Sequence, residues 1–194
     1  MNYMGVVMVS FSLISCASST REQVKVDIIG EWSVCKHVMA KDAQGKDTEK
    51  SEKYALTYSS GNEILTKTGY RRTGCAEADR EGALVITSGY SLGKTASPSN
   101  GATELDTEVI KVSIIPYTSE VLSAYASSND LKYTLNGETD VSSKVNFIGK
   151  KTYNIYLVRG SRLYFGDLGK GYDASAPALR PVSVDFHLSY SKVH

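Results

Sequence analysis

The sequence predicts an all-β protein, an antiparallel meander of about eight strands that closes into a barrel and carries one short helix. Short stretches in which apolar and polar residues alternate recur from residue 28 to the end of the chain. Turn-forming residues rather than helices separate these stretches, and 13 Tyr among 194 residues add strand propensity. Because closure into a barrel removes exposed sheet edges, the barrel is favoured over the alternative, a β-sandwich.

The first half of the domain contains the clearest strand patterns. In the first of them Trp32, Val34 and Val38 share one face, so these side chains are expected to be buried. Polar loops and turns around 41–49, 59–62, 71–82 and 93–103 separate the strands. The predicted strands are residues 28–38, 54–58, 63–70, 83–92 and 104–115.

One helix and several shorter strands follow. Thr118 or Ser119 can cap the helix, an apolar face follows at helical spacing, and the polar residues 127–129 end it. Strands are then expected at 131–135 and 138–147 around the Asn136-Gly137 turn, at 152–158 and 162–165, and at 180–192.

The N-terminal segment predicts export. Residues 5–14 form an apolar run of about ten residues, which is typical of a signal peptide and too short to span a ~30 Å hydrocarbon core. A polar stretch, 17–27, follows at once. We therefore divide the chain into a signal peptide (1–15), a lipidated tether (16–27) and a β-barrel domain (28–194).

The last residues of the signal, Leu13-Ile14-Ser15-Cys16, resemble the lipobox of bacterial lipoproteins. The resemblance implies acylation of Cys16, which would make the membrane a partner through an N-terminal lipid anchor. Ala17 rather than Asp follows the cysteine, which in that family implies the outer membrane of the bacterial cell envelope. The alternative is an ordinary cleaved secretory signal in which Cys16 has no role.

The remaining cysteines, Cys35 and Cys75, are an even pair in an exported chain, so a disulfide is expected between them. Closing a loop of about forty residues would stabilise the fold by roughly 4 kcal/mol. Two free thiols are the alternative, and the distance between the two residues in the folded protein decides between them.

Composition and motifs exclude several functions. With 22 Lys and Arg against 21 Asp and Glu, the chain lacks the basic excess of a nucleic-acid binder. The glycines around Lys94 do not have the spacing of a phosphate loop. Cys35 and His37 share a strand face but have no third or fourth metal ligand nearby. Gly89-Tyr90-Ser91-Leu92-Gly93 has the Gly-x-Ser-x-Gly spacing, but Pro98 prevents the helix that must follow a nucleophile elbow. The sequence therefore predicts no enzyme, no metal and no cofactor.

Gly30-Glu31-Trp32 on the first strand resembles the Gly-x-Trp motif of lipocalins and of bacterial lipocalin-like lipoproteins. The resemblance implies a lipocalin-like barrel in which Trp32 packs at the closed end.

We expect a non-catalytic envelope protein whose barrel binds a small apolar or amphipathic molecule. Tyr54 and Tyr58 alternate onto one strand face and can line such a cavity with their polar tips, although tyrosines of this kind also serve as core or wall. The alternative is an interaction or structural lipoprotein with a filled barrel. The interior volume discriminates between the two.

Overall fold

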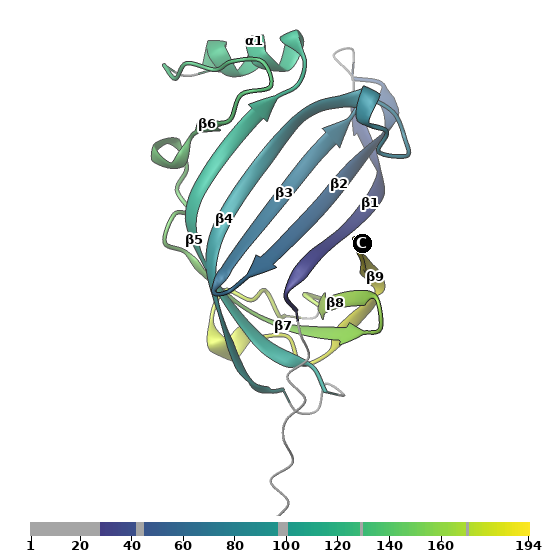
Figure 1. The fold of residues 1–194 in the computed structure, drawn as a ribbon, viewed down its shortest axis with the longest axis vertical. Coiled ribbons are helices and arrows are strands. Elements are labelled where there is room, and N and C mark those ends of the chain that lie inside the picture. Colours follow the sequence, from purple (N-terminus) through teal and green to yellow (C-terminus); the bar gives the residue numbers. More distant parts are fainter. Residues whose placement is uncertain (1–27, 42–44, 97–100, 129, 170) are drawn as a thin grey trace, which may run out of the picture.

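The computed structural model describes residues 28–41, 45–96, 101–128, 130–169 and 171–194, which form an antiparallel eight-stranded barrel (Figure 1). The predicted all-β barrel is thus confirmed over the sandwich. The elements are β1 (Gly30–Lys41), β2 (Asp47–Ser59), β3 (Asn62–Tyr70), β4 (Arg80–Thr95), β5 (Thr103–Pro116), α1 (Ser119–Ser128), β6 (Thr139–Asp140), β7 (Lys151–Arg159), β8 (Arg162–Gly166) and β9 (Val184–Lys192).

Each strand of the barrel pairs with its neighbour in the chain, except that β5 passes to β7 and β9 returns to β1. Tight turns impose the pairing of β2 with β3 and of β7 with β8, because a two-residue connection leaves the next strand no choice but to pair antiparallel. Gly61 (φ 76°) and Gly160 (φ 58°) provide the left-handed conformations at these two turns. The two-residue strand β6 adds to β5 outside the ring.

The wall of the barrel is uneven. Strands β1 to β5 are long, whereas β7 pairs only with the first half of β5, over Thr103 to Glu108. Figure 1 shows β7, β8 and β9 around the lower end, where β1 begins, and the long strands extending beyond them. The ring is therefore complete only at its lower end.

The pairing that closes the ring, between β1 and β9, is also short. β1 pairs with β2 along its whole length, but with β9 only at Trp32 and Ser33 among the described residues. One further backbone hydrogen bond, from the Val193 N–H to the Glu31 carbonyl (2.9 Å), completes this contact.

The helix is confirmed, with the Thr118 hydroxyl accepting the Val121 N–H at 3.3 Å. The predicted hairpin at 131–147 is wrong. Asn136 does adopt a left-handed conformation (φ 60°), but of its described flanks only Thr139–Asp140 is a strand. The segment instead follows β5, and Val141 donates a backbone hydrogen bond to Val112. The turn at Asn136 is thus correctly predicted, but the segments on either side of it do not pair with each other, because the chain packs against β5 instead.

The final strand begins at Val184, later than predicted, and it does not keep a single apolar face. The register against β8 shifts between Tyr164 and Gly166. Phe186 consequently lies outside, 49 % exposed, with its ring 5.3 Å from that of Tyr164. Leu188 and Tyr190 pack against the interior cluster.

The predicted disulfide is confirmed, with Cys35 and Cys75 bonded at a Cα–Cα distance of 6.1 Å. Cys35 lies on the exposed face of β1, and Cys75 lies in the loop between β3 and β4. The Ser51 hydroxyl fixes the same loop, because it accepts the Cys75 N–H (3.0 Å) and donates to the Arg72 carbonyl (2.7 Å). The loop is therefore attached to the outer wall of the barrel.

Candidate functional site in the barrel interior

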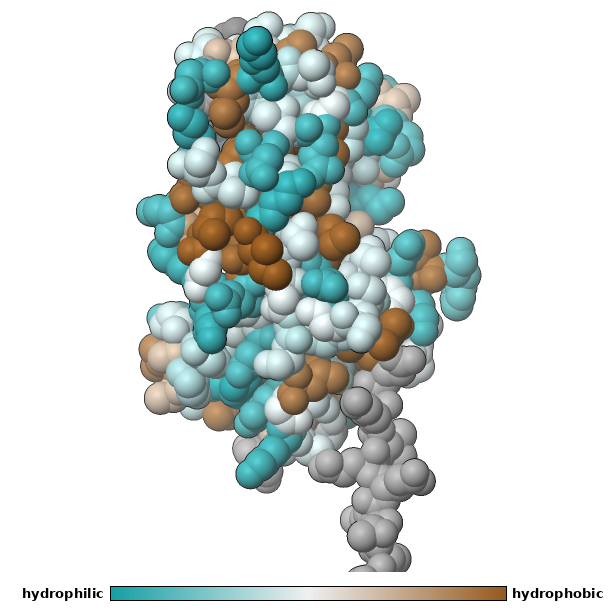
Figure 2. All heavy atoms as spheres, turned by 60° about the vertical axis from the view of Figure 1, so that its left-hand side comes forward, coloured by the Kyte–Doolittle hydropathy of each residue, from teal (hydrophilic) through white to brown (hydrophobic). Residues whose placement is uncertain are grey.

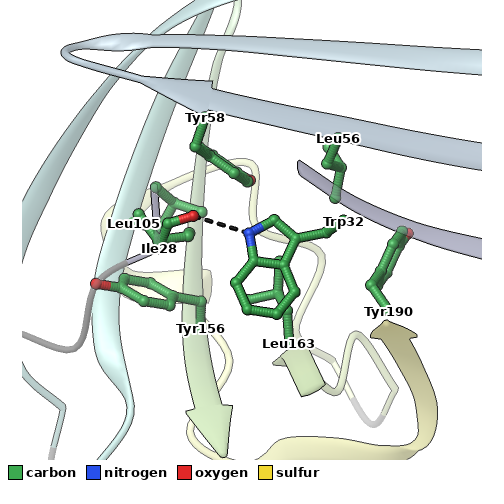
Figure 3. Packing of buried hydrophobic residues seen from close by; sticks show 8 residues of the cluster. All are labelled: Ile28, Trp32, Leu56, Tyr58, Leu105, Tyr156, Leu163 and Tyr190. Atoms are coloured by element: carbon green, nitrogen blue, oxygen red, sulfur yellow. Dashed lines mark hydrogen bonds between the residues drawn. The ribbon is translucent and has the colours of Figure 1, made fainter. Parts of the chain in front are cut away.

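Trp32 forms the floor of the barrel interior. It is 1 % exposed, and its Nε1–H donates a 2.8 Å hydrogen bond to the Ile28 carbonyl, so the one polar group of the indole is satisfied (Figure 3). Ile28, which precedes β1, and side chains from β2, β5 and β7 to β9 surround it. The buried cluster consists of Ile28, Trp32, Leu56, Tyr58, Leu105, Tyr156, Leu163 and Tyr190. The Lys192 ammonium lies 5.3 Å from the ring centroid.

Among these same strands lies a cavity of about 170 Å³. One part of its wall is apolar and includes Leu65 and Phe165, and the other part is polar and includes Thr107 and Thr152, whose hydroxyls are 2.6 Å apart. The complete lining is Leu56, Tyr58, Glu63, Leu65, Leu105, Thr107, Thr152, Asn154, Phe165 and Tyr190. The cavity is therefore amphipathic.

A carboxyl group, Glu63, enters this cavity from β3. It faces Tyr58 across the β2–β3 pair, so both side chains point inward. Burial raises the pKa of Glu63, and a hydrogen bond with Tyr58 opposes part of this rise. Burial likewise raises the pKa of Tyr58 well above its ordinary value and that of Tyr190 to about 12. The inner end of the cavity thus disfavours negative charge.

A second hollow of about 300 Å³ lies along β8 and β9. It shares Asn154, Phe165 and Tyr190 with the interior cavity, and Leu168 and Leu188 add apolar surface. The interior cavity therefore borders a larger opening on the side where β9 leaves β1.

Above the cavity, β1 to β3 present a charged cluster to the inner face. Tyr54 lies between two lysines, with the Lys36 ammonium 4.7 Å and the Lys67 ammonium 5.6 Å from its ring centroid. The Glu52 carboxylate accepts the Tyr54 hydroxyl at 2.7 Å and pairs with Lys67 at 2.8 Å. Burial acts to raise the pKa of Glu52, but these hydrogen bonds lower it below its ordinary value. Hydrogen bonding to Glu52 raises the pKa of Lys67.

The two tyrosines singled out from the sequence occupy different environments. Tyr58 lines the cavity, whereas Tyr54 belongs to the charged cluster, with Leu56 between them on the same face of β2. Sequence reasoning missed Lys36, Glu52 and Glu63 as interior residues. Strand parity contains the signal, because Lys36 follows Trp32 and Val34 at every second position.

A larger hollow, about 430 Å³, lies on the outer wall beside Gly61 and Gly89. Its two carboxylates are already paired, Asp106 with Arg180 (2.7 Å) and Glu108 with Lys151 (3.4 Å). Figure 2 shows apolar side chains gathered at mid-height on the side of the molecule that carries β5. We take the interior cavity as the candidate site because it lies among the barrel strands and brings the Glu63 carboxyl, whose pKa burial raises, together with the buried Tyr58 and Tyr190.

The other residues singled out from the sequence lie away from this cavity. Cys16 lies outside the described residues. His37 is on the outer face of β1, with its Nε2 atom 3.6 Å from Glu49. The described part of the chain holds no group of three side chains suited to bind a metal, and none of its helices is long and apolar enough to cross a membrane. The chain matches no family model, and no curated protein matches it.

Replacing Trp32 by Ala is expected to lower the free energy of unfolding by roughly 3–5 kcal/mol, because it opens a void in the floor. Urea unfolding measures this. Trp32→Phe is the matched control, since it keeps an aromatic ring and should cost less. The single tryptophan should emit at shorter wavelength in the folded protein than in urea. Unchanged stability of the Ala variant would contradict the assigned role.

Replacing Glu63 by Gln is expected to stabilise the barrel relative to the wild type as pH rises. With a native pKa above its unfolded value, Glu63 makes the native state bind more protons between the two values. The wild-type free energy of unfolding therefore falls as pH rises through that window, and the Gln variant lacks this loss. Melting temperatures from about pH 4 to about pH 8 measure the difference.

Glu52→Gln provides the opposite control. Because the native pKa of Glu52 is lowered, its contribution is present above the unfolded pKa and disappears as pH falls through the native pKa. This variant should be less stable than the wild type at neutral pH and equally stable in acid. The same pH trend in both variants would contradict the assignment of either carboxyl.

Proposed function

We propose that the barrel binds one small amphipathic molecule without catalysing a reaction and without a cofactor. The observation that carries this proposal is the interior cavity of about 170 Å³ with the Glu63–Tyr58 pair at its inner end. The polar group of the ligand would meet this pair, and its apolar part would contact Leu65 and Phe165. A ligand that supplies a hydrogen-bond donor adds a second partner, besides Tyr58, to a carboxyl that burial has separated from water.

The volumes limit the size of this ligand. Small-molecule sites commonly measure about 300–1,000 Å³, so the interior cavity alone suits only a small molecule. A longer ligand would have to continue past Phe165 and Tyr190 into the hollow along β8 and β9. We therefore propose entry from that side rather than past Trp32, which fills the floor.

The alternative, a structural or interaction lipoprotein with a filled barrel, is favoured by one observation. Trp32 and its neighbours already occupy the lower end of the interior. The two functions make different predictions about the remaining cavity, which a structural barrel has no need to keep accessible.

We also propose that the protein is a lipocalin-like lipoprotein of the bacterial envelope, anchored through Cys16 and sorted to the outer membrane. The Cys35–Cys75 disulfide supports export, because such bonds persist in oxidising compartments. The burial of Trp32 next to the pairing that closes the barrel supports the lipocalin-like comparison.

Native mass spectrometry of the full chain tests ligand binding, with envelope lipid extract and with 1-octanol as a defined small amphiphile. One adduct per chain is expected. Leu65→Phe, which fills the cavity, should weaken it roughly tenfold or more. Ile64→Phe is the matched control, since Ile64 is the neighbouring residue on β3, lies 40 % exposed and does not line the cavity. No adduct, or equal binding by both variants, would favour the filled barrel.

Replacing Cys16 by Ser is expected to abolish labelling of the protein by a fatty-acid probe in cells. The wild type should carry the label and fractionate with the outer membrane. Equal labelling of the two proteins would contradict the lipid anchor, and labelled wild type in the inner membrane would contradict the sorting alone.

A further inference from the structure

β1 pairs along its whole length with a neighbouring strand on one side only. It pairs with β2 from Gly30 to Lys41, yet its pairing with β9 ends at Ser33. In Figure 1 the upper half of β1 forms the border of the long sheet, while β9 lies lower. The barrel therefore has a sheet edge along the upper half of β1.

The direction of the backbone groups on this edge follows from the closing contact. The Glu31 carbonyl accepts a hydrogen bond from Val193, so odd-numbered residues of β1 direct their N–H and C=O groups away from β2. Four of these residues lie above Ser33, and none of them has a backbone partner on that side within the described chain. Their side chains are exposed, and they are Cys35, His37, Met39 and Lys41.

A row of alternating donors and acceptors is complementary to another extended strand and to little else. We infer that this edge pairs with the same edge of a second copy of the chain. The inference is independent of the ligand proposed for the interior, because it concerns backbone groups on the border of the sheet.

The edge is self-complementary in an antiparallel pairing centred on Val38. In this register Cys35 faces Lys41 of the second copy and His37 faces its Met39. The backbone N–H and C=O groups of all four residues can then form hydrogen bonds with those of the residue opposite. About eight hydrogen bonds form, two for each such pair. On the inner face Lys36 meets Ala40, so no lysine lies directly opposite another lysine.

A disulfide and an ion pair hold the edge in place. The Cys35–Cys75 bond fixes the lower end of the free segment to the outer loop, and Lys41 at the upper end pairs with Asp47 at 3.0 Å. The edge is thus presented as a preformed strand, which reduces the entropy lost on pairing.

Photo-crosslinking of the full chain tests the inference, with benzoylphenylalanine in place of Met39. A product with twice the mass of one chain is expected. A product with a different partner would overturn the second copy as the occupant, and the absence of any product would overturn the interaction edge.

Met39→Pro tests the backbone pairing. Proline removes an N–H that faces away from β2, so it leaves the β1–β2 pairing intact. Sedimentation should show the dissociation constant of the dimer rising roughly tenfold or more, since two hydrogen bonds are lost per dimer. Met39→Ala keeps the N–H and should dimerise like the wild type. Trp32 emission reports whether each variant is folded, and equal dimerisation of a folded Pro variant would overturn the register.

Discussion

The burial of Trp32 is the constraint on which the rest of the structure depends. Its indole fills the lower end of the interior, and within the described chain the residue pairs between β1 and β9 are made by Trp32 itself and by Ser33. The strand that closes the ring therefore attaches at the point where the largest side chain is packed. Beyond that point the two strands separate. The free edge of β1 follows from closure at this single level.

The interior changes character along β2 in the space of a few residues. Tyr58 and Leu56 belong to the packed region, whereas Glu52 lies among lysines at the open end. Glu63 enters from β3 opposite Tyr58, and burial raises its pKa, whereas the hydrogen bonds around Glu52 lower the pKa of that carboxyl. The pKa values of these two carboxyls, which lie on the same inner face, are thus shifted in opposite directions, because one carboxyl meets apolar walls and the other meets cations. This gradient favours an amphipathic occupant over a purely apolar one.

Alternation along the chain was sufficient to predict the barrel and the inward position of Trp32, and a capping residue followed by an apolar face at helical spacing predicted the helix. The same alternation places Lys36 and Glu63 inside, but a charged residue at an inward position looks like a break in the pattern when only apolar residues are counted. The hairpin at Asn136 was mispredicted because turn chemistry specifies a local bend and not what the flanks pair with, and here β5 competes for them. The disulfide was predicted from the even pair of cysteines in an exported chain, but only the fold brings Cys35 and Cys75, forty residues apart along the chain, within 6.1 Å of each other at their Cα atoms.

Different features keep β9 and β1 apart above the contact that closes the ring. β9 shifts register between Tyr164 and Gly166, which turns Phe186 to the outer wall and leaves Leu188 and Tyr190 inside. β1 instead runs straight on with β2, held by Cys35 and by its full ladder of cross-strand pairs. Because the register shift lies in β9, restoring closure would require β9 to change its pairing with β8, while β1 would stay as it is. A strand supplied from outside can occupy the edge of β1 without that rearrangement, which makes pairing between copies the less costly way to satisfy it.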